Sequence, residues 1–483
     1  MVIDALKYQI LQQFGFVPTE EQGQALDAFA RFLTDRDPHA VMILRGSAGT
    51  GKTSLSGAIV RTLKAIRQKV MLLAPTGRAA KVFSLNSGCP AYTIHRRIYR
   101  EKSFAGVDGQ FNLNDNLFTD TLFMVDEASM ISNLGLGGGN FGSGCLLDDL
   151  VRFVYQGHND RLMLIGDKAQ LPPVGEEESP ALNRMMLEGY GLKVYECDLN
   201  EVLRQSQESG ILYNATVIRQ MITHDDITQL PLIRFKGFAD IVMMPGNELV
   251  ESLANSYYRV GQDETMVITR SNKRANIYNN GIRNMVLDRE DELSCGDMLM
   301  IVKNNYFWTE KERNEVMEAL NAIPPFLANG DRAKVLRVSR HMELYGFRFA
   351  TLLLQFPDYD NYEMSVTALL DTLQSEAPAL THEQQEQLFH GVEEDYQDVS
   401  LKADRMKAIR GDQYFNALQV KYAYAITCHK AQGGQWEHVY VDQGYMTDDM
   451  LTPDYIHWLY TAFTRAKDKL FLVNWPKTQT EQA

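Results

Sequence analysis

The chain has 483 residues, 45% of them hydrophobic and 23% charged, and 62 acidic against 48 basic residues give a formal net charge of −14. This length fits about three compact units, and the composition excludes a disordered, collagenous or coiled-coil chain. No apolar run approaches the roughly 20 residues of a membrane helix, and the opening stretch Met1–Phe16 lacks the basic flank and apolar core of a secretory signal. We therefore expect a cytoplasmic protein with no membrane partner.

The cysteines give no sign of a covalent or metal framework. They are odd in number, far apart and without the spacing of metal ligands: Cys89, Cys145, Cys197, Cys295 and Cys428. We expect neither disulfides nor a zinc site.

The strongest local signal is a strand, a glycine-rich loop and a helix in succession. An apolar run over 40–45 leads into Gly46-Ser-Ala-Gly-Thr-Gly-Lys-Thr53, and apolar residues recur at helical spacing through 54–66. This is the phosphate-binding loop pattern in its proper context, and backbone N–H groups at a helix start favour an anion. Lys52 would reach the β- and γ-phosphates of a nucleoside triphosphate, and Thr53 would bind Mg²⁺. The predicted nucleotide-binding residues of the loop are Gly46, Ala48, Gly49, Thr50, Gly51, Lys52, Thr53 and Ser54.

Two acidic residues follow the apolar run 121–125 directly. Asp126 and Glu127 would lie at the carboxyl end of a strand, where α/β sheets bind their ligands. Asp126 would hold Mg²⁺, and Glu127 would orient or deprotonate the attacking water. The alternative is that the pair merely caps a helix start.

An uncharged amide, Gln170, follows the next apolar run in the sequence Gly166-Asp-Lys-Ala-Gln170. Beside the γ-phosphate it could detect whether that phosphate is present and pass the difference onward.

Further apolar runs alternate with helical patterns and predict an α/β fold with two parallel sheets. They are residues 70–74, 121–125, 161–165, 265–269, 439–442 and 470–473. Between about 332 and 419 this pattern stops, and Ala333–Val338 and Phe347–Leu354 favour antiparallel strands. We interpret this stretch as an inserted small β unit with a helical, acidic extension.

The acidic extension, Ser375–Leu401, holds seven carboxylates and no lysine or arginine. It is most simply a solvated face, and the alternative is a docking surface at 376–398 for a basic protein partner.

With these motifs in order, the chain resembles the superfamily-one, subgroup B DNA helicases of the RecD and Dda type. Thr19-Glu-Glu-Gln22 looks like the adenine-reading Q motif of that family, and Ala74–Lys81 is similar to its motif Ia. Ile426–Gly433 looks like motif V and Tyr460–Arg465 like motif VI. The resemblance runs from about Thr19 to Val473 and leaves only the inserts unmatched.

The resemblance implies two RecA-like domains in tandem: 1–195 as the first, and 196–330 with 420–483 as the second. Residues 331–419 would be an inserted SH3-like β subdomain. Gln22 would contact the adenine base, and Arg204 and Arg465 would be aimed at the γ-phosphate. The family also implies 5′-to-3′ travel on single-stranded DNA.

The sequence departs from the family pattern in three places. Motif V has Ala431 where serine is common, and six glycines among Gly135–Gly144 make the stretch after Glu127 unusually long. Only some 18 residues precede the Q motif, which favours a compact, self-sufficient form of the Dda type. Nothing in the sequence requires more than a monomer.

A basic stretch within this acidic chain predicts a nucleic-acid contact. Residues 77–102 hold six basic side chains against one acid, with three aromatic residues interleaved, as binding of single strands requires. The alternative is that Arg96, Arg97 and Arg100 form a solvated helix face. By resemblance, the contacts to DNA would be made by Thr76, His95, Thr427, His429 and Lys430. Arg78 of the basic stretch is a further predicted contact. Residues 97–117 lie where the family inserts a strand-separating hairpin, with Phe104 and Phe111 as candidates for its tip.

The sequence thus predicts an ATP- and Mg²⁺-dependent DNA helicase that acts on single strands and single-strand/duplex junctions. One alternative is an ATP-gated DNA-binding switch or accessory subunit that does not unwind. Another is a small-molecule kinase, which also uses a phosphate loop but has no need of a second α/β domain.

Overall fold

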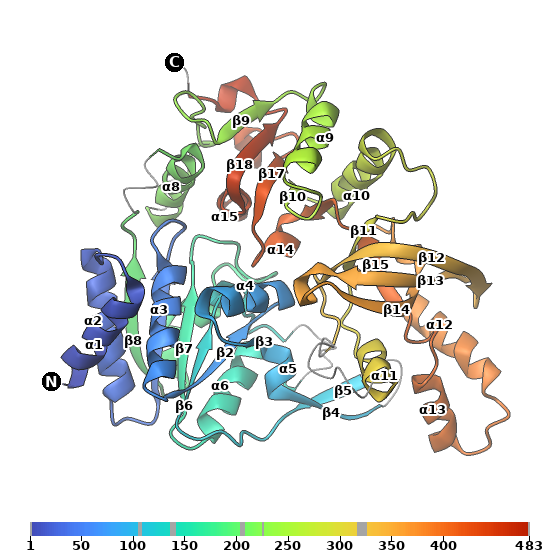
Figure 1. Cartoon of the computed structure of the whole chain (residues 1–483), viewed down its shortest axis with the longest axis horizontal. Coiled ribbons are helices and arrows are strands. Elements are labelled where there is room, and N and C mark those ends of the chain that lie inside the picture. Colours follow the sequence, from blue (N-terminus) through green and yellow to red (C-terminus); the bar gives the residue numbers. More distant parts are fainter. Residues whose placement is uncertain are drawn as a thin grey trace. The chain divides into compact units, whose positions relative to one another are not determined.

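The computed structural model describes residues 2–104, 109–135, 142–202, 208–224, 227–315 and 326–481. They form two compact units (Figure 1). Unit 1 takes Met1–Met243, Ala431–Gln435 and Tyr445–Ala483, and unit 2 takes Met244–Lys430 and Trp436–Gly444. The three-domain division expected from the sequence stays a prediction.

Unit 1 is built on a six-stranded parallel sheet with the strand order β3-β2-β6-β7-β1-β8. Its strands are β1 (Ala40–Gly46), β2 (Lys69–Ala74), β3 (Ala91–Thr93), β6 (Thr121–Val125), β7 (Arg161–Gly166) and β8 (Lys193–Leu199). The central strands β1, β6 and β7 are buried along their whole length. Near-continuous apolar runs form such strands because helices cover both faces of a parallel sheet.

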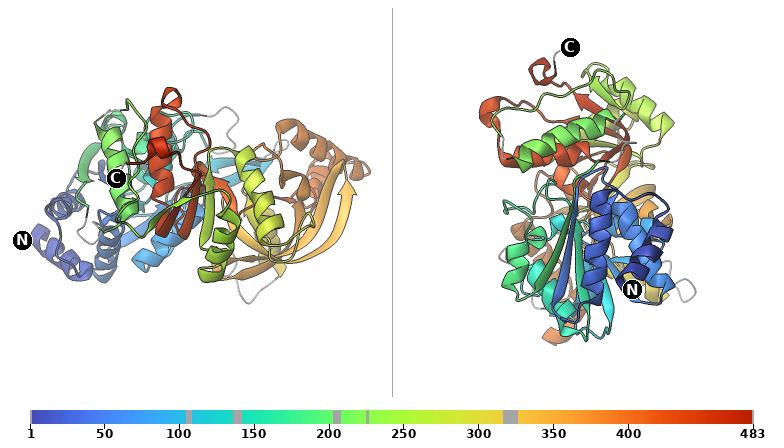
Figure 2. Two further views of the ribbon diagram at one scale, coloured as in Figure 1. Left: turned by 90° about the horizontal axis from the view of Figure 1, so that it is seen from above. Right: turned by 90° about the vertical axis from the view of Figure 1, so that its left-hand side faces the viewer.

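The side chains of β1 show how this sheet makes two cores. Met42 and Leu44 pack with the apolar faces of the first three helices, whereas Val41 and Ile43 pack with the helices on the other face. The alternation follows from the two-residue period of a strand. Figure 2 shows the blue helices α1 to α3 together on one side of the sheet.

The helices of unit 1 begin with α1 (Val2–Phe14), α2 (Glu20–Thr34), α3 (Lys52–Ala65), α4 (Gly77–Ser87) and α5 (Ile94–Ile98). They continue with α6 (Leu146–Gln156), α7 (Arg184–Gly189), α8 (Gly210–Thr223) and α15 (Pro453–Phe463), and two further strands, β9 (Ile241–Met244) and β18 (Ala466–Val473), accompany them. Helix α15 is buried on most of its surface, which makes it part of the interior of the unit although it is remote in sequence.

A β-hairpin, β4 (Tyr99–Phe104) and β5 (Gly109–Leu113), occupies the stretch where the sequence predicts one. Phe111 is half-buried and packs against the core beneath the sheet. Its expected place at the tip is therefore wrong: it anchors the hairpin to the unit. The side chain of Phe104 and the turn at 105–108 lie outside the described residues.

Unit 2 contains a second set of parallel strands, in which β10 (Thr265–Thr269) pairs with β16 (Ala425–Thr427) and β17 (Trp436–Asp442). Its helices include α9 (Leu249–Arg259), α10 (Asn272–Gly281) with a π-helical continuation (Ile282–Val286), α11 (Phe307–Glu315) and α14 (Cys428–Ala431). Both units therefore contain parallel strands with helices, as the predicted α/β fold class requires.

Unit 2 also holds a closed barrel of β11 (Met298–Ile301), β12 (Arg332–Leu344), β13 (Phe347–Phe356), β14 (Tyr362–Leu369) and β15 (Leu418–Tyr422). The predicted antiparallel pair is confirmed as β12 and β13. Helices α12 (His382–Asp395) and α13 (Lys402–Arg410) lie beside the barrel (Figure 1). Leu388 and Val392 of α12 pack into a core with Phe347 and Phe349 of β13, whereas most of the carboxylates of this segment are exposed.

Two further expectations can be compared with the structure. All five cysteines are free. Within the described ranges, no helix combines the length and the apolar character needed to cross a bilayer, and no group of three or more histidine, cysteine or acidic side chains could hold a metal ion.

Candidate nucleotide-hydrolysis site

The glycine-rich loop joins the end of β1 to the start of α3, as its sequence predicts. Gly49 and Gly51 adopt left-handed backbone conformations, with φ of +79° and +74°, which favour glycine. The Thr50 hydroxyl donates to the carbonyl of Ser47 (2.8 Å), and the Lys52 ammonium donates to the carbonyl of Gly46 (3.2 Å). The loop is therefore folded back on itself, with its lysine at the head of α3.

Gln22 holds this loop from outside. Its side-chain oxygen accepts the N–H of Thr19 (3.0 Å) in a capping box at the start of α2, and its Nε2 donates to the carbonyl of Thr50 (2.9 Å). The side chain is buried. Gln22 thus links α2 to the loop, and its contact with an adenine base stays a prediction.

Asp126 and Glu127 follow β6 at its carboxyl end. Asp126 Oδ1 accepts the N–H of Glu127 (2.9 Å). Glu127 has a φ of +52°, a strained conformation for a non-glycine residue of the kind that gathers at functional sites. Its Oε2 is buried with no hydrogen-bond partner among the described residues. A buried carboxylate oxygen without a donor is costly, so this position is suited to a bound water or cation.

Gln170 stands in a turn that follows β7. Asp167 Oδ1 accepts the N–H of Ala169 (2.9 Å), and the N–H of Gln170 donates to the carbonyl of Asp167 (3.3 Å). The Gln170 side-chain oxygen is buried and has no partner in the described chain. The side-chain oxygen of Gln170 is therefore available to accept a hydrogen bond from a ligand.

Arg465 follows α15 and is nearly fully buried, with 2% of its surface exposed. Its guanidinium donates to the carbonyls of Thr461 (3.0 Å) and Gly434 (3.1 Å) and to the hydroxyl of Thr464 (3.1 Å). None of these partners is a carboxylate, so the positive charge is not neutralised by an ion pair there. Such an arginine is suited to an anionic ligand.

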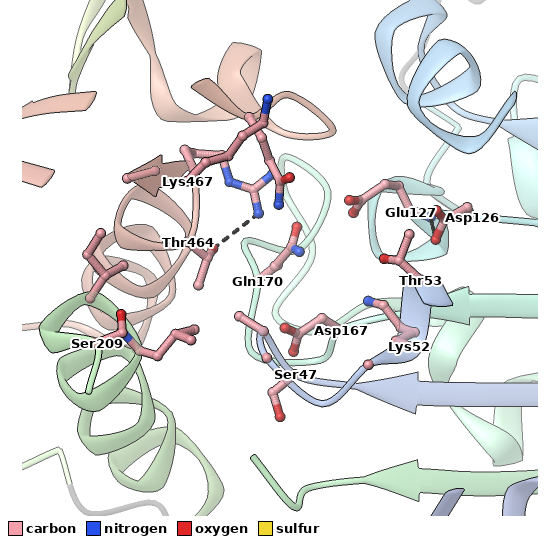
Figure 3. A pocket seen from close by; sticks show the side chains of 18 residues that line it. Ser47, Lys52, Thr53, Asp126, Glu127, Asp167, Gln170, Ser209, Thr464 and Lys467 are labelled. Carbon is pink, nitrogen blue, oxygen red and sulfur yellow. Dashed lines mark hydrogen bonds between the residues drawn. The ribbon is translucent and has the colours of Figure 1, made fainter. Parts of the chain in front are cut away.

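Most of these groups line one cavity of about 390 Å³ within unit 1. Figure 3 shows Lys52, Thr53, Asp126 and Glu127 on one side of it and Gln170 facing them. The predicted site residues that line it are Ala48, Gly49, Gly51, Lys52, Thr53, Asp126, Glu127, Gln170 and Arg465. Gln22, Gly46, Thr50 and Ser54 are not among the lining residues, and Arg204 lies outside the described residues.

The carboxylates of the cavity crowd one another. Burial raises the pKa of Asp126 to about 6, the charge of Glu127 adds to this effect, and Lys52 opposes it. Burial also raises the pKa of Asp167, against the lowering effects of Lys52 and of a hydrogen bond from Tyr460. Since a nearby cation favours ionised carboxylates, a divalent ion beside Asp126 would relieve this crowding.

The residues expected to contact DNA from the first domain lie in unit 1. Thr76 caps α4 by accepting the N–H of Ala79 (3.2 Å), and Arg78 donates to the carbonyl of Gln435 (2.9 Å). Gly433, with a φ of +73°, passes so near that a Cβ there would lie 2.9 Å from Ala79. Motifs Ia and V are therefore held together by a close backbone approach that only glycine allows.

His95 is half-buried on α5, where its ring lies 5.7 Å from that of Tyr99. Burial lowers its pKa to about 4, although the charge of Asp149 opposes the shift. The imidazole is therefore neutral at physiological pH. In the DNA-free chain the ring can therefore offer a hydrogen bond or a stacking contact but carries no positive charge.

The remaining three predicted DNA contacts lie in unit 2. Thr427 ends β16, and His429 and Lys430 follow in α14. His429 is exposed and Lys430 is half-buried. Burial lowers the pKa of the Lys430 ammonium, as expected for a cation withdrawn from water.

Two stretches of the chain match known protein families. Residues 19–227 match the AAA domain, and residues 422–473 match the UvrD-like helicase C-terminal domain. Over 157 residues, 32% of its length, the chain is 31% identical to the ATP-dependent RecD2 DNA helicase of Deinococcus radiodurans. These matches support the resemblance to the RecD-like superfamily-one helicases.

Other similar proteins are more remote or less well described. An uncharacterised protein of Methanocaldococcus jannaschii is 33% identical over 171 residues, or 33% of the chain. The aligned stretches take in 14% of that protein and 18% of the Deinococcus protein, less than a fifth of either relative. Among solved structures, the Pif1 helicase from Bacteroides in complex with ADP-AlF3 and ssDNA is 14% identical. That comparison covers 97% of this chain and 95% of the other, with a TM-score of 0.47.

Sequence reasoning assigned no role to two contributors to the site. Asp167 could have been found by the rule that identified Asp126, because it follows the carboxyl end of a parallel strand. Tyr460 donates to Asp167 Oδ2 (2.6 Å) and accepts the N–H of Ala48 (3.0 Å). No local pattern marks this contact, since Tyr460 is 412 residues from Ala48.

We expect His95 to make the protein less stable in acid. The unfolded state takes up a proton near pH 6.5, whereas the folded state does so only near 4, so the free energy of unfolding falls as the pH drops through this window. In His95→Gln this loss should shrink, measured as the urea midpoint between pH 7.5 and 4.5. The exposed His158→Gln serves as control; equal slopes in His95→Gln and wild type would contradict the assignment.

Proposed function

We propose that this chain is an ATP-dependent DNA helicase that moves along single-stranded DNA in the 5′-to-3′ direction and separates duplex strands at junctions. The observation that carries the proposal is the cavity of unit 1. It gathers a phosphate loop, two acids at a strand end, a free amide acceptor and an arginine without a carboxylate partner. A nucleotide-dependent ATPase of this family needs each of these groups.

The residues present fit Mg²⁺ together with a nucleoside triphosphate. Thr53 and Asp126 offer the hydroxyl and carboxylate oxygens that Mg²⁺ prefers, and the orphaned Oε2 of Glu127 lies in the same cavity. When bound, the ion would supply charge neutralisation between the phosphates. Thr53 and Asp126 are therefore the residues that we assign to hold it.

The chain's own groups then divide the work of hydrolysis. Lys52 binds the β- and γ-phosphate oxygens, as the loop N–H groups do. Glu127 accepts the proton of the attacking water through its unpartnered carboxylate oxygen, and Arg465 offsets charge that develops on the transferred phosphoryl group. Gln170 reports the presence of the γ-phosphate through its free amide. Arg204 stays a predicted second arginine.

Movement on DNA requires that nucleotide binding change the grip on the strand. Thr76, Arg78 and His95 in unit 1 and Thr427, His429 and Lys430 in unit 2 are the proposed contacts. One segment of the chain connects the proposed DNA contacts to the hydrolysis cavity. Motif V contains the proposed contact Lys430 and continues to Gly433, which lies beside Thr76. Two residues later, Gln435 lines the cavity. The direction of travel rests on the resemblance to the family.

Lys52→Ala and Glu127→Gln should each abolish DNA-stimulated ATP hydrolysis, with a loss of roughly a thousandfold or more, while binding of single-stranded DNA survives. ATP turnover is measured with and without single-stranded DNA, and DNA affinity by fluorescence anisotropy. Matched controls are Lys64→Ala, exposed on the same helix, and Glu177→Gln, exposed beyond Gln170. Normal turnover in either site variant would refute the site assignment.

Strand displacement separates the proposed helicase from its alternatives. The full chain with ATP should release the strand from a duplex with a 5′ single-stranded tail and leave a duplex with a 3′ tail intact. DNA-stimulated ATPase activity without displacement from either substrate would instead indicate an ATP-gated switch. ATP consumption at the same rate with and without DNA would favour a small-molecule kinase.

A further inference from the structure

The hydroxyl of Tyr460 occupies an unusual position between the phosphate loop and the turn that carries Gln170. It accepts the N–H of Ala48 (3.0 Å) and donates to Asp167 Oδ2 (2.6 Å). The side chain is 1% exposed. Burial raises its pKa well above that of a free tyrosine, and the charge of Asp167 adds to this effect. The hydroxyl therefore keeps its proton and donates it in the hydrogen bond to Asp167.

Asp167 passes this contact on to the turn. Its second oxygen accepts the N–H of Ala169, and its carbonyl accepts the N–H of Gln170. One carboxylate thus joins the tyrosine to the backbone that aims the Gln170 amide. A buried carboxylate satisfied in this way is rigid, because each lost donor would leave charge without compensation.

The same face of α15 holds the rest of the turn. The Thr461 hydroxyl accepts the N–H of Leu171 (2.8 Å), and Nδ1 of His457 lies 2.9 Å from the carbonyl of Ala169. Positions 457, 460 and 461 share a helix face because they are three and four residues apart. One turn further on, Arg465 donates from Nε to the carbonyl of Thr461. The helix therefore ties the arginine and the Gln170 turn together.

We propose that Tyr460 is a positioning residue that links the state of the phosphate loop to Gln170 through Asp167. The N–H of Ala48 belongs to the loop whose N–H groups bind phosphate in this motif. If phosphate binding moves the N–H of Ala48, the tyrosine hydroxyl loses or shifts its donor. The hydrogen bond from Tyr460 to Asp167 then carries this movement to the turn that holds Gln170. This inference rests on the proposed ATPase function and assigns a coupling residue within its site.

The test uses Tyr460→Phe, which keeps the buried ring and removes only the hydroxyl, together with Asp167→Asn and the double variant. Kinetic constants for ATP hydrolysis are measured with and without single-stranded DNA on the full chain. We expect kcat to fall about tenfold in Tyr460→Phe, as for loss of a charge-assisted hydrogen bond, with KM changed less than about threefold. The double variant should be no worse than the more impaired single variant, because both act through one connection.

Tyr195→Phe is the matched control. The Tyr195 hydroxyl also donates to a half-buried carboxylate, that of Asp35, with 2.5 Å to Oδ2. Tyr195 does not line the cavity. It should leave kcat and KM unchanged. Thermal unfolding of every variant shows whether a loss of kcat reflects a loss of folded protein.

The outcomes separate the two proposals. A kcat within twofold of wild type in Tyr460→Phe, a loss confined to KM, or losses that multiply in the double variant would overturn the role of Tyr460 and leave wild-type unwinding untouched. Conversely, a wild-type chain that hydrolyses ATP but displaces no strand contradicts the helicase, and the role of Tyr460 is still decided by kcat. A wild-type chain without ATPase activity overturns both.

Discussion

The electrostatic balance around Lys52 is the constraint on which the rest of the site depends. Its ammonium lowers the pKa of both Asp126 and Asp167, while burial and the charge of Glu127 raise them. Three carboxylates can be brought to one buried place only if cations offset them. Lys52 supplies one cation at the start of α3, and a bound divalent cation would supply the remaining positive charge. The carboxylates therefore favour a bound divalent cation there, and the phosphate loop favours the triphosphate.

The parallel sheet of unit 1 supplies the geometry for this balance. Strands β1, β6 and β7 are neighbours in the sheet, and each is followed at its carboxyl end by part of the site: the phosphate loop, Asp126 with Glu127, and Asp167 with Gln170. The remaining wall comes from α15 and the residues after it. Their contacts to the loop and to the turn after β7 join segments roughly three hundred to four hundred residues apart.

Much of this could be predicted from the sequence, because strand ends and loop motifs are local patterns. Lys52, Asp126, Glu127 and Gln170 were expected together and do line one cavity. Contacts between distant segments carry no local signal, which is why Tyr460 with Asp167, and Gln22 with the carbonyl of Thr50, emerge only from the structure. Phe111 was misplaced for a related reason: an aromatic residue in a hairpin marks apolar surface, and only packing decides whether that surface is a wedge or an anchor. The short strands β11 and β15 likewise have too few residues to show a period of their own.

The central claim is that the loop ahead of α3 recognises the phosphates of a nucleotide. Equilibrium binding of ADP and AMP to the full chain, with Mg²⁺ and by isothermal titration calorimetry, tests it most directly. Because Lys52 and the loop N–H groups engage the β-phosphate, ADP should bind at least about a hundredfold more tightly than AMP, the equivalent of two charge-assisted hydrogen bonds. Equal affinity for ADP and AMP would contradict the account.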